Sequence, residues 1–131
     1  MIKARLPQLR YLTTQLQADK ETCEEKMKSI MASAYLYLGL LAKRDNDMEK
    51  AMHYTRLSLR VDPEFHLAYY NLGVMHQDAG NIEGMFECFR NATEISPSDG
   101  QSWSALGDAF FRKGMGDEAR SAYEIAKSLI E

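Results

Sequence analysis

The chain has 131 residues, of which 45% are hydrophobic and 27% are charged, and its formal net charge is −3. This composition suits one folded unit, and no run approaches the ~20 consecutive apolar residues that a membrane-spanning helix requires. With 16 basic against 19 acidic residues, the chain also lacks the excess of cations with which proteins bind nucleic acids or anionic membranes.

The segment 1–31 comes first, and its pattern differs from the rest of the chain. Leucines recur in it at the spacing of one helical face, which predicts an amphipathic helix: Leu6, Leu9, Leu12 and Leu16. A polar stretch, 17–25, follows them. We therefore expect an N-terminal helical extension or a divergent hairpin that caps the following units. A helix that binds in trans or swaps between protomers, a partly disordered arm, and a helix folded back into a binding groove remain alternatives.

From residue 32 onward the sequence repeats itself every 34 residues. Gly39, Gly73 and Gly107 each follow a leucine by one position and an aromatic residue by four, and Pro63 and Pro97 recur at one phase as well. A fixed period of this length indicates a small structural unit copied along the chain.

Each copy contains two stretches with helical apolar spacing, separated by a short polar turn. One such hairpin cannot bury its own apolar face, so the copies are expected to stack into a solenoid. Glycine in the middle of a helix costs roughly 0.5–1 kcal/mol relative to alanine, and its recurrence at one phase predicts that the paired helix approaches closely there. Asn46 followed by Glu49 has the form of a capping box that would start the second helix of the first copy.

The copies resemble the tetratricopeptide repeat, with units at 32–65, 66–99 and 100–131. The third copy carries the family pattern most fully, at Trp103, Leu106, Gly107, Phe110, Ala119, Tyr123 and Ala126. The first is weakest in its second helix, where Thr55 replaces an aromatic residue and Ser58 an alanine. The resemblance implies an all-α fold, a right-handed superhelix of antiparallel helical hairpins.

Residues that could carry catalysis are scattered. His53, His66 and His76 share no metal-ligand spacing with each other or with the cysteines, and the glycines do not form a phosphate-binding loop. Cys23 and Cys88 are far apart, which favours a reducing, cytoplasmic setting over a disulfide framework. We expect no enzymatic activity, no metal and no cofactor.

The family resemblance implies instead that the first helix of each repeat lines a concave groove that binds a protein or peptide. The expected ligand is an apolar helix or extended segment, with Tyr70 as the main anchor. We call the residues that the resemblance places in this groove the inner-face set: Leu36, Leu40, Lys43, Leu67, Tyr70, Asn71, Val74, Gln77, Ser104, Asp108 and Phe111.

Two other kinds of partner can be weighed. Chaperone-tail-binding members of the family hold a terminal carboxylate with a clamp of cationic and amide side chains, and the matching phases here read Leu36, Leu40, Asn71, Gln101 and Ala105. An acidic chaperone tail is therefore not the expected ligand. The alternative to a groove-binding module is a structural unit that assembles with itself, through uncapped solenoid ends or a swapped N-terminal helix.

Overall fold

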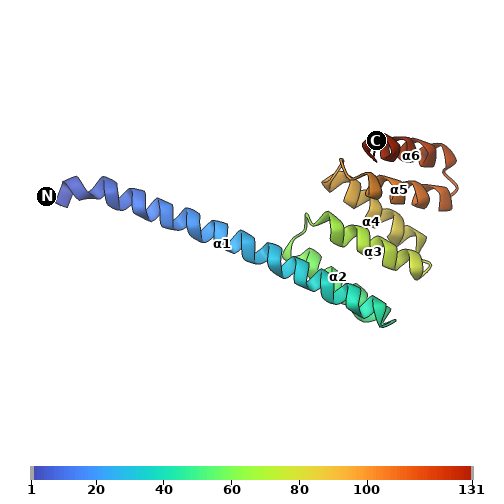
Figure 1. The fold of residues 1–131 in the computed structure, drawn as a ribbon, viewed down its shortest axis with the longest axis horizontal. Coiled ribbons are helices and arrows are strands. Elements are labelled where there is room, and N and C mark those ends of the chain that lie inside the picture. The colour runs from blue at the N-terminus through green and yellow to red at the C-terminus, as the bar shows by residue number, and fades with distance from the viewer. Residues whose placement is uncertain (1, 131) are drawn as a thin grey trace.

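The computed structural model describes residues 2–130, with side chains from residue 7 onward, so the side chain of Leu6 lies outside the described residues. It contains six helices and, within the described part, no strand: α1 Ile2–Arg44, α2 Met48–Val61, α3 His66–Asp78, α4 Ile82–Ile95, α5 Gly100–Arg112 and α6 Gly116–Ile130. The helices form three pairs, α1 with α2, α3 with α4 and α5 with α6, and the pairs stack in chain order (Figure 1). The all-α prediction is confirmed.

The recurring glycines lie where the two helices of a pair meet. A β-carbon on Gly73 would lie 2.6 Å from a ring carbon of Phe89 on α4, and one on Gly107 would lie 2.7 Å from a ring carbon of Tyr123 on α6. Both distances are well below van der Waals contact. In these two pairs the aromatic ring of the second helix therefore occupies the space that a side chain on the first helix would need.

The first pair is held by polar residues at the same phases. A β-carbon on Gly39 would lie 2.6 Å from the Thr55 hydroxyl oxygen and 2.9 Å from the backbone oxygen of Ala51, so the helix backbones themselves approach closely. The Ser58 hydroxyl donates a hydrogen bond of 2.6 Å to the backbone oxygen of Ala32. Thr55 and Ser58 are fully buried, and they join α2 to α1 where the other pairs use a ring and an alanine.

The residue that caps α2 differs from the expected one. Asp47, and not Asn46, is the N-cap, and its carboxylate accepts a hydrogen bond of 3.1 Å from the backbone N–H of Lys50. Asn46 has a φ of 63°, a left-handed conformation that asparagine tolerates better than most residues. The capping-box prediction was wrong by one position, because Asn46 completes the turn that ends α1.

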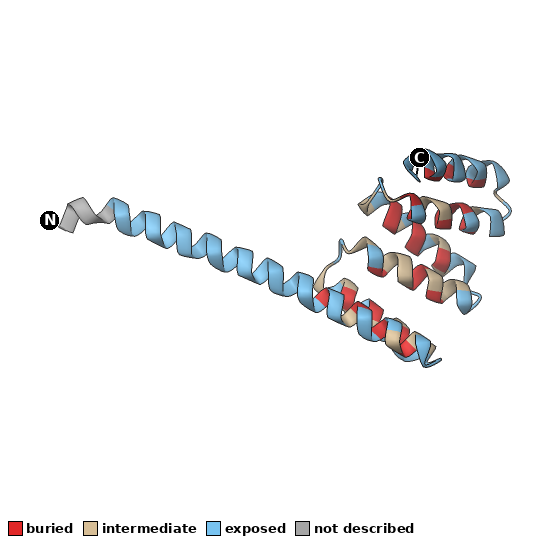
Figure 2. Ribbon diagram, viewed as in Figure 1, coloured by how far each residue is buried: buried red, intermediate tan, exposed pale blue. Residues whose placement is uncertain are grey.

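The N-terminal segment is one continuous helix with the first helix of the first repeat. The hairpin prediction for 1–31 was wrong, because α1 runs from Ile2 to Arg44 without a turn. No glycine or proline occurs between Gln8 and Leu38, and the polar stretch consists largely of good helix formers. We call residues 7–31 the arm; every one of them is exposed (Figure 2). The arm leads away from the stack and does not fold back onto the inner face (Figure 1).

Candidate functional site

The inner-face set lies on α1, α3 and α5, the first helices of the three pairs. Three apolar members present their side chains to solvent: Leu40 is 36% exposed, Leu67 44% and Phe111 70%. Each of the three helices thus contributes one exposed large apolar side chain to the surface that the family resemblance implies.

Leu36 does not belong to this surface. Its side chain is only 7% exposed, so the prediction that it contacts a ligand was wrong. Leu36 follows Ala32 by four residues and precedes Gly39 by three, and both of these contact α2. Residues at this spacing share one helical face, and Leu36 is therefore directed into the first helical pair.

Tyr70 and Val74 connect the inner face to the core. Both are half-buried and pack against the cluster that contains Phe89 and Ala105. The Tyr70 ring lies 5.6 Å from the Phe89 ring, centroid to centroid, at an interplanar angle of 44°. Tyr70 therefore contributes to the packing of α3 on its neighbours, and it is less free to act as a ligand anchor than its phase suggested.

The charged members of the set have partners inside the chain. The Lys43 ammonium lies 3.3 Å from the Asp78 carboxylate, which links the C-terminal ends of α1 and α3. The Tyr123 hydroxyl donates a hydrogen bond to the Asp108 carboxylate. Desolvation, together with this hydrogen bond and the nearby negative charge, raises the pKa of Tyr123 to about 12, so the hydroxyl keeps its proton at neutral pH.

The amide and hydroxyl members of the inner-face set differ in whether their side chains already form a hydrogen bond. The Asn71 side chain donates a hydrogen bond of 2.8 Å to the backbone oxygen of Leu67, within its own helix. Gln77 and Ser104 are half-buried. Asn71 and Asp108 therefore already form side-chain hydrogen bonds within the chain.

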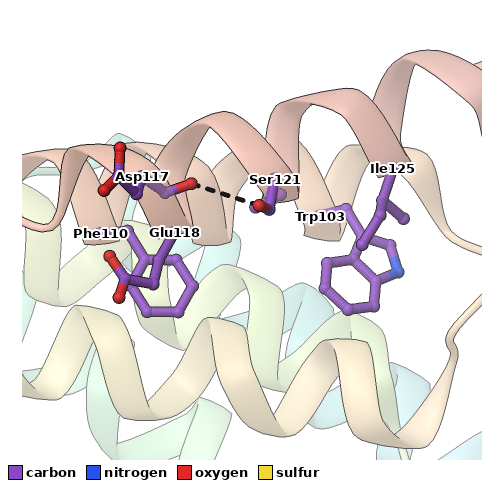
Figure 3. Close-up of a pocket in the computed structure, with 7 residues that line it drawn as sticks. Trp103, Phe110, Asp117, Glu118, Ser121 and Ile125 are labelled. Atoms are coloured by element: carbon purple, nitrogen blue, oxygen red, sulfur yellow. Dashed lines mark hydrogen bonds between the residues drawn. The ribbon is translucent and has the colours of Figure 1, made fainter.

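A hollow between α5 and α6 was not anticipated from the sequence. It encloses about 370 Å³ and is lined by Trp103, Phe110, Asp117, Glu118, Ser121, Ala122 and Ile125. Figure 3 shows Trp103 and Ile125 at one end and Phe110 with the two carboxylates at the other. The Ser121 hydroxyl donates a hydrogen bond to the Asp117 backbone oxygen, within α6. The residue that could have indicated this hollow from the sequence is Ile125, because it is an apolar residue on the mostly polar face of α6.

His76 is half-buried and lies beside Asn81, the residue that caps α4. Burial, with a further contribution from Arg56, lowers the pKa of His76 below its usual value, and its Nδ1 lies 3.3 Å from the Asn81 amide nitrogen. Among the described residues, no group of three or more His, Cys, Asp and Glu side chains is arranged to hold a metal ion.

Comparison with known proteins identifies the repeat. The tetratricopeptide repeat model matches residues 32–65 and 66–99. Superkiller protein 3 of Schizosaccharomyces pombe is 34% identical over 71 residues, which cover 54% of this chain and 5% of that protein. The peroxisomal targeting signal receptor of Kluyveromyces lactis is 33% identical over 70 residues, 53% of this chain and 12% of the receptor. The chain thus spans only a small part of either relative.

Solved structures share the fold. The second TPR domain of Spaghetti (RPAP3), bound to the HSP90 peptide SRMEEVD, superposes with a TM-score of 0.75 at 17% identity. The match covers 82% of this chain and 98% of that domain. No helix among the described residues is long and apolar enough to cross a membrane.

Proposed function

We propose that this chain, which belongs to the tetratricopeptide repeat family, is a non-catalytic protein-interaction module that binds an apolar helical or extended segment on the inner face of α1, α3 and α5. The module comprises the three helical pairs, residues 32–131, and the arm is a separate element. The two free cysteines support a reducing, cytoplasmic setting.

One observation carries the choice of ligand. The two charged residues of the inner-face set, Lys43 and Asp108, are already paired within the chain, whereas its exposed apolar members are covered by no element of the described residues. A partner segment therefore gains most by burying Leu67 and Phe111, because each large apolar side chain removed from water contributes roughly 1.5–3 kcal/mol. One or two such anchors usually dominate an interface.

The same observation argues against an acidic tail as the ligand. A TPR domain of similar fold is bound to the peptide SRMEEVD, which carries three carboxylate side chains. In this chain Lys43 is held by Asp78, and two clamp phases carry Gln101 and Ala105. A carboxylate ligand would have to displace Asp78 from Lys43, which adds a desolvation and repulsion cost.

The test is binding of the whole chain to an array of apolar helical and extended peptides, with SRMEEVD as the comparison peptide. We expect the wild type to prefer apolar peptides, and Leu67→Glu and Phe111→Glu each to weaken the best of them at least tenfold. Tyr11→Glu is the matched control, because Tyr11 is 68% exposed but lies on the arm.

Two results would contradict the proposal. Stronger binding of SRMEEVD than of every apolar peptide would show that the charges of the inner face select the ligand. Equal losses with Leu67→Glu and Tyr11→Glu would place the binding surface outside the inner face. Far-UV circular dichroism of each variant separates a loss of binding from a loss of folding.

A further inference from the structure

The arm carries an apolar stripe that no described residue outside the arm covers. Leu9, Leu12, Leu16, Cys23, Met27 and Ile30 make up this stripe, and its five large side chains are each more than half exposed. Ile30 lies about 160° around α1 from Ala32, at roughly 100° per residue, so the stripe points away from the side on which α2 packs. In proteins most helical stability comes from packing of such a face, and the arm makes no such contact within the chain.

The apolar positions of the stripe are spaced symmetrically about its centre. Counted from the midpoint between Asp19 and Lys20, Leu9 is as far on one side as Ile30 is on the other. Leu12 corresponds in the same way to Met27, and Leu16 to Cys23. A helix with this symmetry matches a second copy of itself laid antiparallel, because every apolar residue of one copy then meets an apolar residue of the other.

We propose that the arm forms an antiparallel two-helix coiled coil with the arm of a second copy of this chain, centred between Asp19 and Lys20. This goes beyond the proposed function, because the inner face takes no part in it. The interface is isologous, the kind found in two-fold symmetric dimers, and the pairing from Leu9 to Ile30 is about 32 Å long. It is neither a stacking of solenoid ends nor an exchange of helices between protomers.

The charges at the centre select the antiparallel orientation. Asp19 and Lys20 interrupt the apolar stripe, and in the antiparallel pair Asp19 of each copy lies beside Lys20 of the other. A parallel pair in register would instead place Asp19 beside Asp19 and Lys20 beside Lys20. Polar residues at core positions specify register and partner in this way, and like charges directly opposed are unfavourable.

The first experiment measures the mass of the full chain over a range of concentrations by sedimentation. We expect a dimer. Each dimer contains Leu12 twice, so Leu12→Glu should raise the dissociation constant at least about a hundredfold. Tyr11→Glu should leave it unchanged, because Tyr11 is more exposed than Leu12, 68% against 54%, but points away from the stripe. A wild-type monomer at all concentrations, or equal effects of the two variants, overturns the proposal. So does a monomer whose stripe captures an unrelated protein.

A charge exchange then tests whether the partner is a second copy. Asp19→Lys should weaken the dimer, because lysines then face each other at the centre. The double variant Asp19→Lys with Lys20→Asp should restore it, because the two opposite charges meet again when both copies carry the exchange. Failure of the double variant to recover the wild-type dissociation constant rules out this register.

The free thiol of Cys23 reports the orientation. In the antiparallel pair the two Cys23 residues are about seven helical positions apart along the axis, on the order of 10 Å, which is too far for a disulfide. Leu16→Cys would place the new thiol opposite Cys23 of the second copy. Under a mild oxidant this variant should give a covalent dimer and the wild type should not. Rapid wild-type cross-linking through Cys23 would indicate a parallel pair and overturn the proposal.

Discussion

Replacing Gly73 by alanine tests the principle on which the repeat is built. The new methyl group would lie 2.6 and 2.8 Å from two carbons of the Phe89 ring, so the ring must move by about 1 Å to reach ordinary contact at 3.5–4.0 Å. Phe89 is only 1% exposed and packs against Tyr70, which leaves little room for that movement.

The expected loss follows from two opposing terms. Overpacking of a core typically costs 1–3 kcal/mol, and alanine gains up to about 1 kcal/mol of helix propensity over glycine. We therefore expect Gly73→Ala to lower the free energy of unfolding by about 1–2 kcal/mol. Gly73→Leu should lose more, because its longer side chain must push α3 and α4 apart.

The matched control is Gly116, a helical glycine around which a β-carbon would meet nothing within 4 Å. Gly116→Ala should be neutral or stabilising by up to about 1 kcal/mol. Urea unfolding followed by far-UV circular dichroism measures both variants as a change of midpoint at constant slope.

A second substitution shows whether the ring is the cause. Phe89→Leu removes the ring carbons that the new methyl group would touch, so Gly73→Ala should cost less in that background, and the double-mutant cycle should show a coupling. The reasoning is refuted if Gly73→Ala is as stable as the wild type, or if the cost of Gly73→Ala is the same with and without the Phe89 ring.

Two further predictions concern titratable groups. Burial raises the pKa of the Cys88 thiol to about 11, whereas Cys23 is exposed on the arm of the single chain. In the Leu12→Glu variant, whose arms should be unpaired, an alkylating reagent at about pH 8 should modify Cys23 rapidly and Cys88 only after unfolding. Two rapidly reacting thiols in the folded variant would contradict the burial of Cys88. Burial, and then Arg56, lower the pKa of His76, so the folded state favours the neutral ring. The stability that the neutral ring contributes is fully present above the unfolded pKa near 6.5 and is lost as the pH falls through the lower pKa of the folded state. The urea midpoint of the wild type should therefore fall between about pH 7 and 5 more than that of His76→Phe, and equal slopes against pH would show that His76 does not sense acid.

The repeats could be predicted from the sequence because their packing depends on periodic residues. Gly73 and Gly107 stand at one phase for one steric reason, and the rings that require them, Phe89 and Tyr123, recur at another. The structure also explains the departures in the first repeat, since Thr55 fits against Gly39 and Ser58 bonds to the backbone of α1. Periodicity therefore indicated both the helices and their contacts.

The arm and parts of the inner face lay beyond this kind of prediction. Good helix formers at 17–25 are equally compatible with a helix that continues and with one that ends nearby, because no packing residue marks the choice. The position of a residue within the repeat indicates the direction in which its side chain leaves the helix, but not which residues a long side chain contacts. The ring of Tyr70 thus extends from the inner face to the ring of Phe89. Leu36 was also misplaced from the sequence, because on α1 it shares one helical face with Ala32 and Gly39, which contact α2.

The arm and the inner face lie on different parts of α1, and this separation has a functional consequence. In the antiparallel pair each module begins, at residue 32, about 12 residues from the midpoint, so the two modules would begin about 38 Å apart at opposite ends of the coiled coil. A partner with a single apolar segment would bind each module independently. A partner that presents two segments at that spacing would bind both, and the second binding event would be intramolecular, which raises the overall affinity without a new contact. Pairing through the arm would thus change which partners the chain selects while leaving the inner face of each module as it is.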